Sequence, residues 1–139
     1  MRKQLAEALG VRTSEEVLHA DRRNMRGVRS LRLVTWNCQG GFNRKVEAIE
    51  ALQPDLAIIQ ECECPDRLRS RAAAWQVRPI VWCGDSPTKG LAVISFTGAQ
   101  LEVDPIYDST LKHLLPILVT GSHSFRLLAV WTKEDVEKR

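Results

Sequence analysis

Two polar residues that follow apolar segments have side chains suited to metal and phosphate chemistry. Asn37 comes directly after "LRLVTW", and Glu61 comes directly after "PDLAIIQ". A carboxylate beside an amide oxygen is a hard-oxygen environment, which suits Mg²⁺ or Mn²⁺ better than a softer metal. Asparagine is also a common turn residue, and a glutamate at a strand end is commonly only solvated. The pair alone therefore leaves a site and two surface residues as open alternatives.

The elements around these two residues predict that they meet. Residues 31–36 and 54–61 have the apolar and β-branched character of strands, and residues 43–53 carry apolar side chains at helical spacing. A strand, a helix and a strand over about 30 residues fit a right-handed crossover between parallel strands. Both strands then end at the same sheet edge, where open α/β sheets bind ligands. Asn37 and Glu61 are expected to converge there.

Two glycines follow Asn37 and explain how the chain leaves the site. Gly40 and Gly41 allow the backbone to turn sharply toward the helix without a side chain entering the site. The glycine turn is therefore expected to leave this sheet edge open.

The rest of the chain predicts an α/β fold with a mixed sheet. Short apolar segments separated by turn residues follow the polar stretch "CPDRLRSRAAAW", which carries no predicted element. We expect the sheet to continue as antiparallel hairpins, with strands at residues 78–83, 90–96, 100–103, 116–120 and 125–131.

Residues 1–30 are predicted to be a separate N-terminal appendage, helical and then basic. Helical spacing indicates short helices at residues 3–9 and 14–22, followed by the basic segment "DRRNMRGVRS". The first part weakly resembles a helix-turn-helix, but no segment with base-reading side chains follows the turn. A peripheral appendage is therefore preferred over a DNA reader, and residues 31–139 form the predicted main domain.

The composition restricts the class of protein and the kinds of partner that we expect. With 44% hydrophobic and 27% charged residues, the chain falls in the globular class, and its net charge of +3 is too small to indicate nucleic-acid binding. Four cysteines without paired histidine ligands predict reduced thiols rather than zinc. No segment has the character of a signal peptide or a membrane span, so we expect a cytoplasmic protein without membrane contact.

Four segments in register carry a family resemblance. "LRLVTWNCQGGF", "PDLAIIQECE", "KGLAVIS" and "FRLLAVWT" resemble, in this order, the first half of the endonuclease/exonuclease/phosphatase family with its deoxyribonuclease I-like fold. The resemblance covers residues 31 to 133. It implies about one half of a β-sandwich flanked by helices, within a partial endonuclease/exonuclease/phosphatase domain at residues 31–139.

The resemblance also implies a chemistry. Glu61 matches the acid that binds the divalent ion, and Asn37 matches the residue that helps organise the metal site, so both are catalytic candidates. Lys89, at the start of a predicted strand, is a candidate contact for a phosphate, or a solvated turn lysine. The implied cofactor is Mg²⁺ or Mn²⁺. The implied activity is hydrolysis of a phosphate ester, which includes nucleic acid, by an activated water.

The second half of the family pattern is missing from the sequence. The family's Gly-Asp-x-Asn and Ser-Asp-His motifs have no counterpart; Asp85 sits in a first-half turn, and His113 and His123 precede the family histidine. We therefore expect a truncated domain. Two interpretations remain open. In the first, the chain belongs to a family of metal-dependent phosphodiesterases and nucleases, whether or not it is active alone. In the second, it is a non-catalytic protein, either a remnant or a binding module. With about one sheet encoded, one apolar face would lack a cover, which predicts self-association.

Overall fold

The computed structural model describes residues 29–133. The chain divides into two units, Met1–Ser30 and Leu31–Arg139, and the elements described are those of the second unit. The helices expected at residues 3–9 and 14–22 lie outside the described residues.

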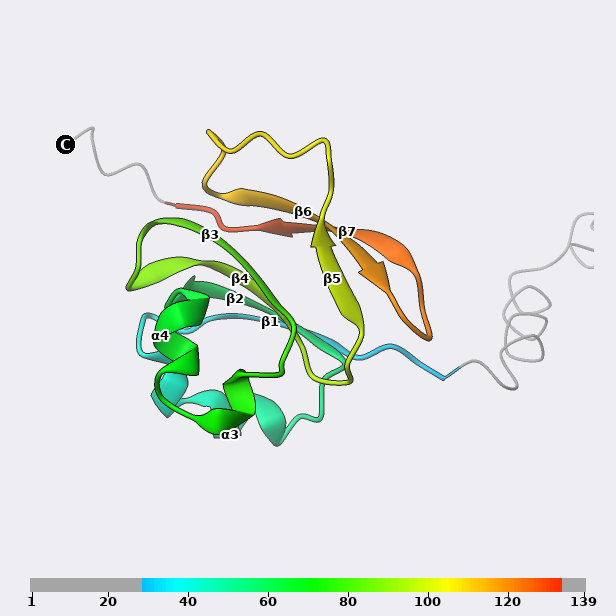
Figure 1. Ribbon diagram of the computed structural model, residues 1–139, viewed down its shortest axis with the longest axis horizontal. Coiled ribbons are helices and arrows are strands. Elements are labelled where there is room, and N and C mark those ends of the chain that lie inside the picture. Colours follow the sequence, from blue (N-terminus) through cyan, green and yellow to red (C-terminus); the bar gives the residue numbers. More distant parts are fainter. Residues whose placement is uncertain (1–28, 134–139) are drawn as a thin grey trace, which may run out of the picture. The chain divides into compact units, whose positions relative to one another are not determined.

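Seven strands and four short helical segments make up the described part of the second unit (Figure 1). The strands are β1 (Leu33–Asn37), β2 (Leu56–Cys62), β3 (Ile80–Ser86), β4 (Lys89–Ser95), β5 (Gln100–Val103), β6 (Leu114–Thr120) and β7 (Phe125–Val130). The helical segments are η1 (Phe42–Arg44), α3 (Val46–Glu50), α4 (Pro65–Arg69) and η2 (Ala73–Trp75).

The first sheet is mixed and has the order β1-β2-β4-β3. β1 and β2 are parallel, with Leu33 paired to Leu56 and Asn37 paired to Gln60, so the predicted strand–helix–strand unit is confirmed. β2 and β3 both pair antiparallel with β4. β2 carries apolar side chains on both faces, as expected for a strand that is covered on both sides.

The second sheet is antiparallel, with the order β5-β6-β7. Its inward side chains, among them Leu115, Ile117 and Ala129, form a core with Leu56 and Val93 of the first sheet. The expectation of a single sheet with one bare face is therefore wrong. The chain turns at Gly98, which has a φ of 82°, and the following strands pair with one another and stack on the first sheet.

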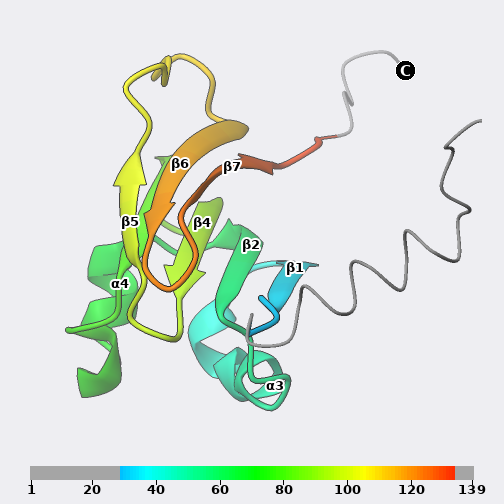
Figure 2. The same cartoon turned by 90° about the vertical axis from the view of Figure 1, so that its right-hand side faces the viewer.

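The helical segments cover the opposite face of the first sheet. Phe42, Ile49, Leu68 and Trp75 form a second core with side chains of β2 and β4 that include Ile59. Figures 1 and 2 show the resulting layers, with α3 and α4 on one side of the first sheet and β5, β6 and β7 on the other. The architecture is thus mixed α/β, with two sheets and few helices.

Two helical predictions need correction. The helix expected at residues 43–53 is broken at Lys45, whose φ of −121° and ψ of 0° separate η1 from α3. Gln53, with a φ of 49°, lies beyond the end of that helix in a left-handed conformation. The polar stretch after Glu63 contains α4 and η2, which sequence periodicity missed because each buries a single large apolar side chain, Leu68 and Trp75.

The outer face of the second sheet carries exposed apolar side chains. Leu128 and Val130 of β7 are 58% and 41% exposed, and Leu128 pairs with Pro116 of β6. Within residues 29–133, β7 has a strand partner on one side only. The apolar surface therefore lies on this outer face, not between the sheets. In the same part of the chain, no helix is long and apolar enough to cross a membrane.

Candidate functional site

A cleft opens at the carboxyl ends of β1 and β2. It has a volume of about 530 Å³, and its walls include the β3–β4 hairpin and the segment after β7. Asn37, Glu61 and Lys89, the three residues singled out from the sequence, all line it. The parallel pairing of β1 with β2 brings the first two together, and β4 starts at Lys89 beside them.

Direct contacts join these three side chains. Asn37 Nδ2 donates a hydrogen bond to Glu61 Oε1 at 3.3 Å, and Lys89 Nζ forms an ion pair with Glu61 Oε2 at 3.0 Å. The Oδ1 atom of Asn37 accepts the Gln39 N–H at 3.0 Å. The amide nitrogen of Asn37 therefore faces the carboxylate. In this arrangement Asn37 orients the carboxylate of Glu61, which is the acidic member of the trio.

The charge of Glu61 is stabilised by its neighbours. The hydrogen bond from Lys89 is the largest influence and lowers the pKa of the Glu61 carboxyl; the Asn37 hydrogen bond acts in the same direction, against a partial desolvation. Glu61 is thus ionised at neutral pH. Its side chain is 20% exposed, so a cation in the cleft can reach it.

The backbone presents Glu61 to the cleft in an unusual conformation. Glu61 has a φ of 59°, and the pairing of β2 with β4 shifts register between Gln60 and Cys62. Such a bulge re-aims a side chain, and here the Glu61 side chain lines the cleft. The Cys38 thiol donates to the Glu61 carbonyl at 3.3 Å, and the Trp82 indole donates to the Cys62 carbonyl at 3.1 Å. Hydrogen bonds from Cys38 and from Trp82 therefore fix the two backbone carbonyls of the bulge.

The Trp82 indole requires glycine on the neighbouring backbone. A Cβ at Gly90 would lie 2.3 Å from the ring, and one at Gly84 would lie 2.7 Å from it. Any larger residue would displace the indole from its hydrogen bond to Cys62. The glycine in "KGLAVIS" therefore supports the position of Glu61 through packing.

The loop after Asn37 explains why the first strand stops there. Gln39, Gly40 and Gly41 have φ values of 56°, 79° and 64°, which turn the chain sharply away from the cleft. Lys45 closes this turn by donating hydrogen bonds to the carbonyls of Cys38 and Gly40. The loop fixes the Gln39 N–H that orients Asn37.

A scan against models of protein families and a search of curated proteins find no match for this chain. The chemistry of the cleft is therefore inferred from the residues that line it.

The cleft is also lined by four further residues with ionisable side chains, which the sequence did not single out as a group: Asp85, Lys112, His113 and Lys133. The ring of His113 packs edge-on against Trp131 at 5.3 Å, and its Nδ1 atom is buried without a hydrogen-bond partner. The ammonium of Lys133 lies 4.6 Å from the Trp131 ring centre. His123 lies instead in the β6–β7 turn, beside Ser122. Asp85 had a weak sequence signal in its "GDSP" turn; His113 had none.

All four cysteines are free thiols. Burial raises the pKa of Cys38, of Cys62 and of Cys83, which keeps these thiols protonated at neutral pH. Within residues 29–133, no group of three or more His, Cys, Asp or Glu side chains is arranged to hold a metal ion.

Proposed function

We propose that the cleft is a phosphate-ester site in which Glu61 holds Mg²⁺ or Mn²⁺ and Lys89 contacts the phosphate. The observation that carries this proposal is the convergence of Asn37, Glu61 and Lys89 at the carboxyl ends of two adjacent parallel strands. An ionised carboxylate next to an exposed ammonium offers complementary partners for a hard cation and for an anionic oxygen.

The donor set fits a hard divalent cation, with few protein ligands. Glu61 is ionised and accessible, and Asn37 fixes one of its oxygens. The other oxygen faces Lys89, whose side chain is 55% exposed and long enough to swing away. Mg²⁺ requires near-octahedral oxygen ligation and commonly keeps several waters, so a single carboxylate predicts weak binding.

Each residue of the trio has a separate role in this proposal. Glu61 binds the cation, Asn37 keeps the carboxylate oriented, and Lys89 moves from Glu61 to an oxygen of the phosphate. A divalent ion bound there would stabilise negative charge on the phosphate oxygens. The ammonium of Lys89 would add to that stabilisation from the other side of the cleft.

We further propose that residues 31–133 adopt a deoxyribonuclease I-like arrangement, as the four sequence segments imply. Two stacked sheets, with helices on the outer face of the first, agree with that expectation. The family's Gly-Asp-x-Asn and Ser-Asp-His motifs have no counterpart in these 139 residues. General acid–base help is worth about 10² to 10⁴ in rate. We therefore expect hydrolysis by this chain alone to stay near the uncatalysed rate.

A second candidate is a binding module that holds a phosphate without cleaving it. The observation that favours it is that three lysines, Lys89, Lys112 and Lys133, line the same cleft. In this case Lys89 and its neighbours bind the anion directly. Metal binding at Glu61 separates the two candidates.

Electron paramagnetic resonance of free Mn²⁺ tests the proposal. The chain should remove Mn²⁺ from solution, with a dissociation constant in the range of roughly 10⁻⁴ to 10⁻³ M expected of weak oxygen sites. Glu61→Gln should abolish this binding, because it removes the charge and keeps the shape. Glu102→Gln, on exposed β5, is the matched control and should leave binding unchanged. Equal binding by both variants would reject the metal role of Glu61.

A further inference from the structure

A second pocket lies next to the Glu61 cleft and shares Lys89 with it. This pocket, which we call the arginine pocket, has a volume of about 350 Å³ and is lined by Arg44, Arg67, Arg71, Glu63 and Lys89, together with glycine backbone. Its cations come from three places in the chain: the end of η1, the region of α4 and the start of β4.

Glycine backbone lets the cations approach closely. A Cβ at Gly41 would lie 2.8 Å from Arg44 Nη2, and a Cβ at Gly40 would lie 3.9 Å from Lys89 Cε. The guanidinium of Arg44 therefore lies against the loop that follows Asn37. The turn that positions Asn37 thus also forms part of the arginine pocket.

The pocket has a strong excess of positive charge. Glu63 is the one carboxylate among its lining residues; it is buried, and its Oε2 accepts the Phe42 N–H at 2.9 Å. Among residues 29–133, none of the ion pairs involves Arg44, Arg67 or Arg71. All three arginines are exposed. Their charges are thus available to an anion from solution.

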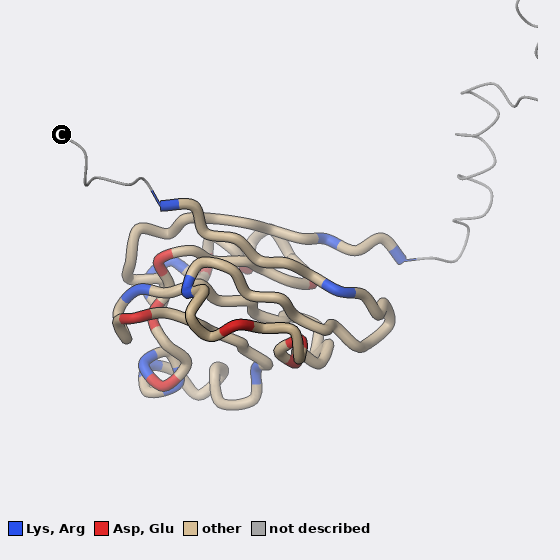
Figure 3. The backbone as a smooth tube through the Cα atoms, turned by 90° about the horizontal axis from the view of Figure 1, so that it is seen from above, with Lys and Arg blue, Asp and Glu red and all other residues tan. Residues whose placement is uncertain are grey.

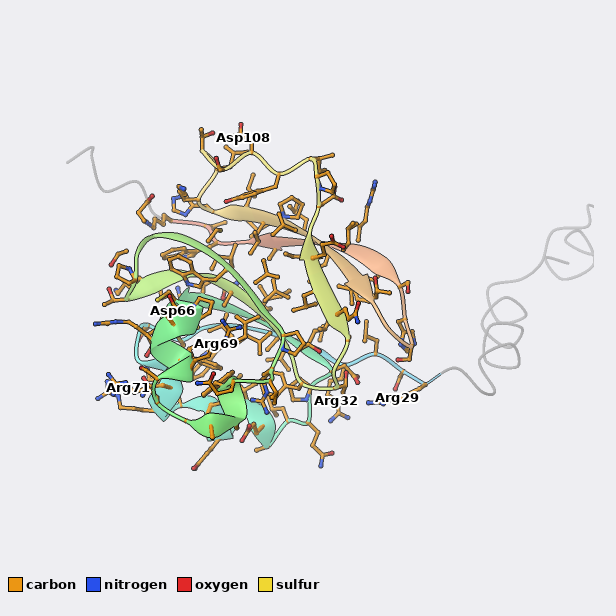
Figure 4. All side chains as sticks on the ribbon, in the orientation of Figure 1. Arg29, Arg32, Asp66, Arg69, Arg71 and Asp108 are labelled. Atoms are coloured by element: carbon orange, nitrogen blue, oxygen red, sulfur yellow. The ribbon has the colours of Figure 1, made fainter. Side chains whose placement is uncertain are left out.

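Charged residues of both signs gather at one end of the described part of the molecule (Figure 3). Figure 3 shows basic and acidic positions gathered at the left end, where Figure 1 has α4 and the β3–β4 hairpin. In Figure 4, Arg71 projects at that end, whereas Arg32 lies to the right of the centre. The two pockets together are lined by six Lys or Arg side chains and three Asp or Glu side chains, which gives the lining a formal net charge of +3. The net charge of the entire chain is also +3. A small overall charge is therefore concentrated around the site.

We propose that the arginine pocket binds a phosphate of a nucleic-acid strand next to the phosphate held in the Glu61 cleft. This inference rests on the proposed function, since it makes the cleft one of two adjoining phosphate sites. Guanidinium groups bind phosphates through paired hydrogen bonds, and Lys89 lies between the two sites. A small phosphate monoester would use only one pocket. A nucleic-acid strand presents the repeated charges that fill both.

Fluorescence anisotropy with a short fluorescein-labelled single-stranded oligonucleotide, in EDTA to prevent cleavage, tests this inference. The double variant Arg67→Gln/Arg71→Gln should bind at least roughly fivefold more weakly, and its slope of log K against log salt should fall by about 0.7 for each phosphate that the protein no longer neutralises. Arg44→Gln probes the same pocket from a different element and should weaken binding in the same direction. Arg126→Gln, on β7 of the second sheet, is the control outside both pockets; because it also removes the ion pair of Arg126 with the buried Asp104, its thermal unfolding midpoint is measured alongside.

The outcomes separate this inference from the proposed function. Oligonucleotide binding that is absent, or that falls equally in the pocket variants and in Arg126→Gln, would overturn the inference. Glu61-dependent Mn²⁺ binding would stand in that case. Conversely, arginine-dependent oligonucleotide binding with Mn²⁺ binding unaltered by Glu61→Gln would support the pocket and reject the metal site. Equal thermal unfolding midpoints exclude misfolding as the cause of a loss.

Discussion

Replacing Lys89 by methionine should strengthen metal binding while it weakens phosphate binding. The Lys89 ammonium lies 3.0 Å from Glu61 Oε2, where it competes with a divalent cation for the same oxygen. Methionine keeps much of the length and apolar character of the lysine stem but carries no charge. The carboxylate then loses its internal partner and becomes more available to Mn²⁺.

The size of this effect follows from the exposure of the pair. Lys89 is 55% exposed and Glu61 20% exposed, so solvent screens the attraction well below its value in a buried pair. Measured exposed ion pairs contribute about 0.2–1 kcal/mol. Loss of that competition corresponds to a gain in Mn²⁺ affinity of up to roughly fivefold. Affinity for inorganic phosphate should fall, because the cleft loses one cation.

Titration of free Mn²⁺ by electron paramagnetic resonance measures the first effect, and isothermal calorimetry with phosphate measures the second. Lys112→Met is the matched control, since Lys112 lines the same cleft but is not among the groups that lower the pKa of Glu61. It should change Mn²⁺ affinity less than Lys89→Met does. A lower Mn²⁺ affinity in Lys89→Met, or equal gains in both variants, would refute direct competition at Glu61.

Three further predictions concern stability, thiols and assembly. The pKa of Glu61 is lowered in the folded chain, so its pairing with Lys89 stabilises the fold when the pH is above the ordinary carboxyl pKa of 4.5. The few-degree difference in Tm between the unmodified chain and Lys89→Met should therefore shrink as the pH falls below 4.5. In the native chain at neutral pH, Ellman's reagent should react first with the thiol of Cys64, which is partly exposed. Cys64→Ser should remove this fast reaction phase. Fast reaction of several thiols would contradict the burial of the other three cysteines. Sedimentation should show self-association that Leu128→Lys abolishes; a stable monomer of the unmodified chain would reject an interface on the outer face of the second sheet.

Much of the candidate site was accessible from sequence because it depends on strand direction. Parallel strands place their carboxyl ends together, and this rule alone brings Asn37 beside Glu61. The paired glycines at 40 and 41 likewise predicted the sharp turn that follows β1. Both features are local or follow from one short crossover, so a pattern of residue types is enough to predict them.

Other features depend on contacts between distant segments and had little or no sequence signal. His113 reaches the cleft because the long segment between β5 and β6 leads back to it, and nothing in its neighbourhood indicates that path. The stacking of two sheets was missed because apolar strands look alike whether they extend a sheet or start another. The amide orientation of Asn37 depends on the Gln39 N–H, whose direction is set by the three-dimensional path of the loop.

Paramagnetic broadening of backbone and side-chain NMR signals by low concentrations of Mn²⁺ tests most directly whether Glu61 holds a divalent cation in the cleft. If it does, the Asn37 side-chain amide and the backbone amides of Glu61 and Lys89 should broaden first, and Glu61→Gln should remove this selective broadening. First broadening at acidic residues outside the cleft, or unchanged broadening in Glu61→Gln, would contradict a metal role for Glu61.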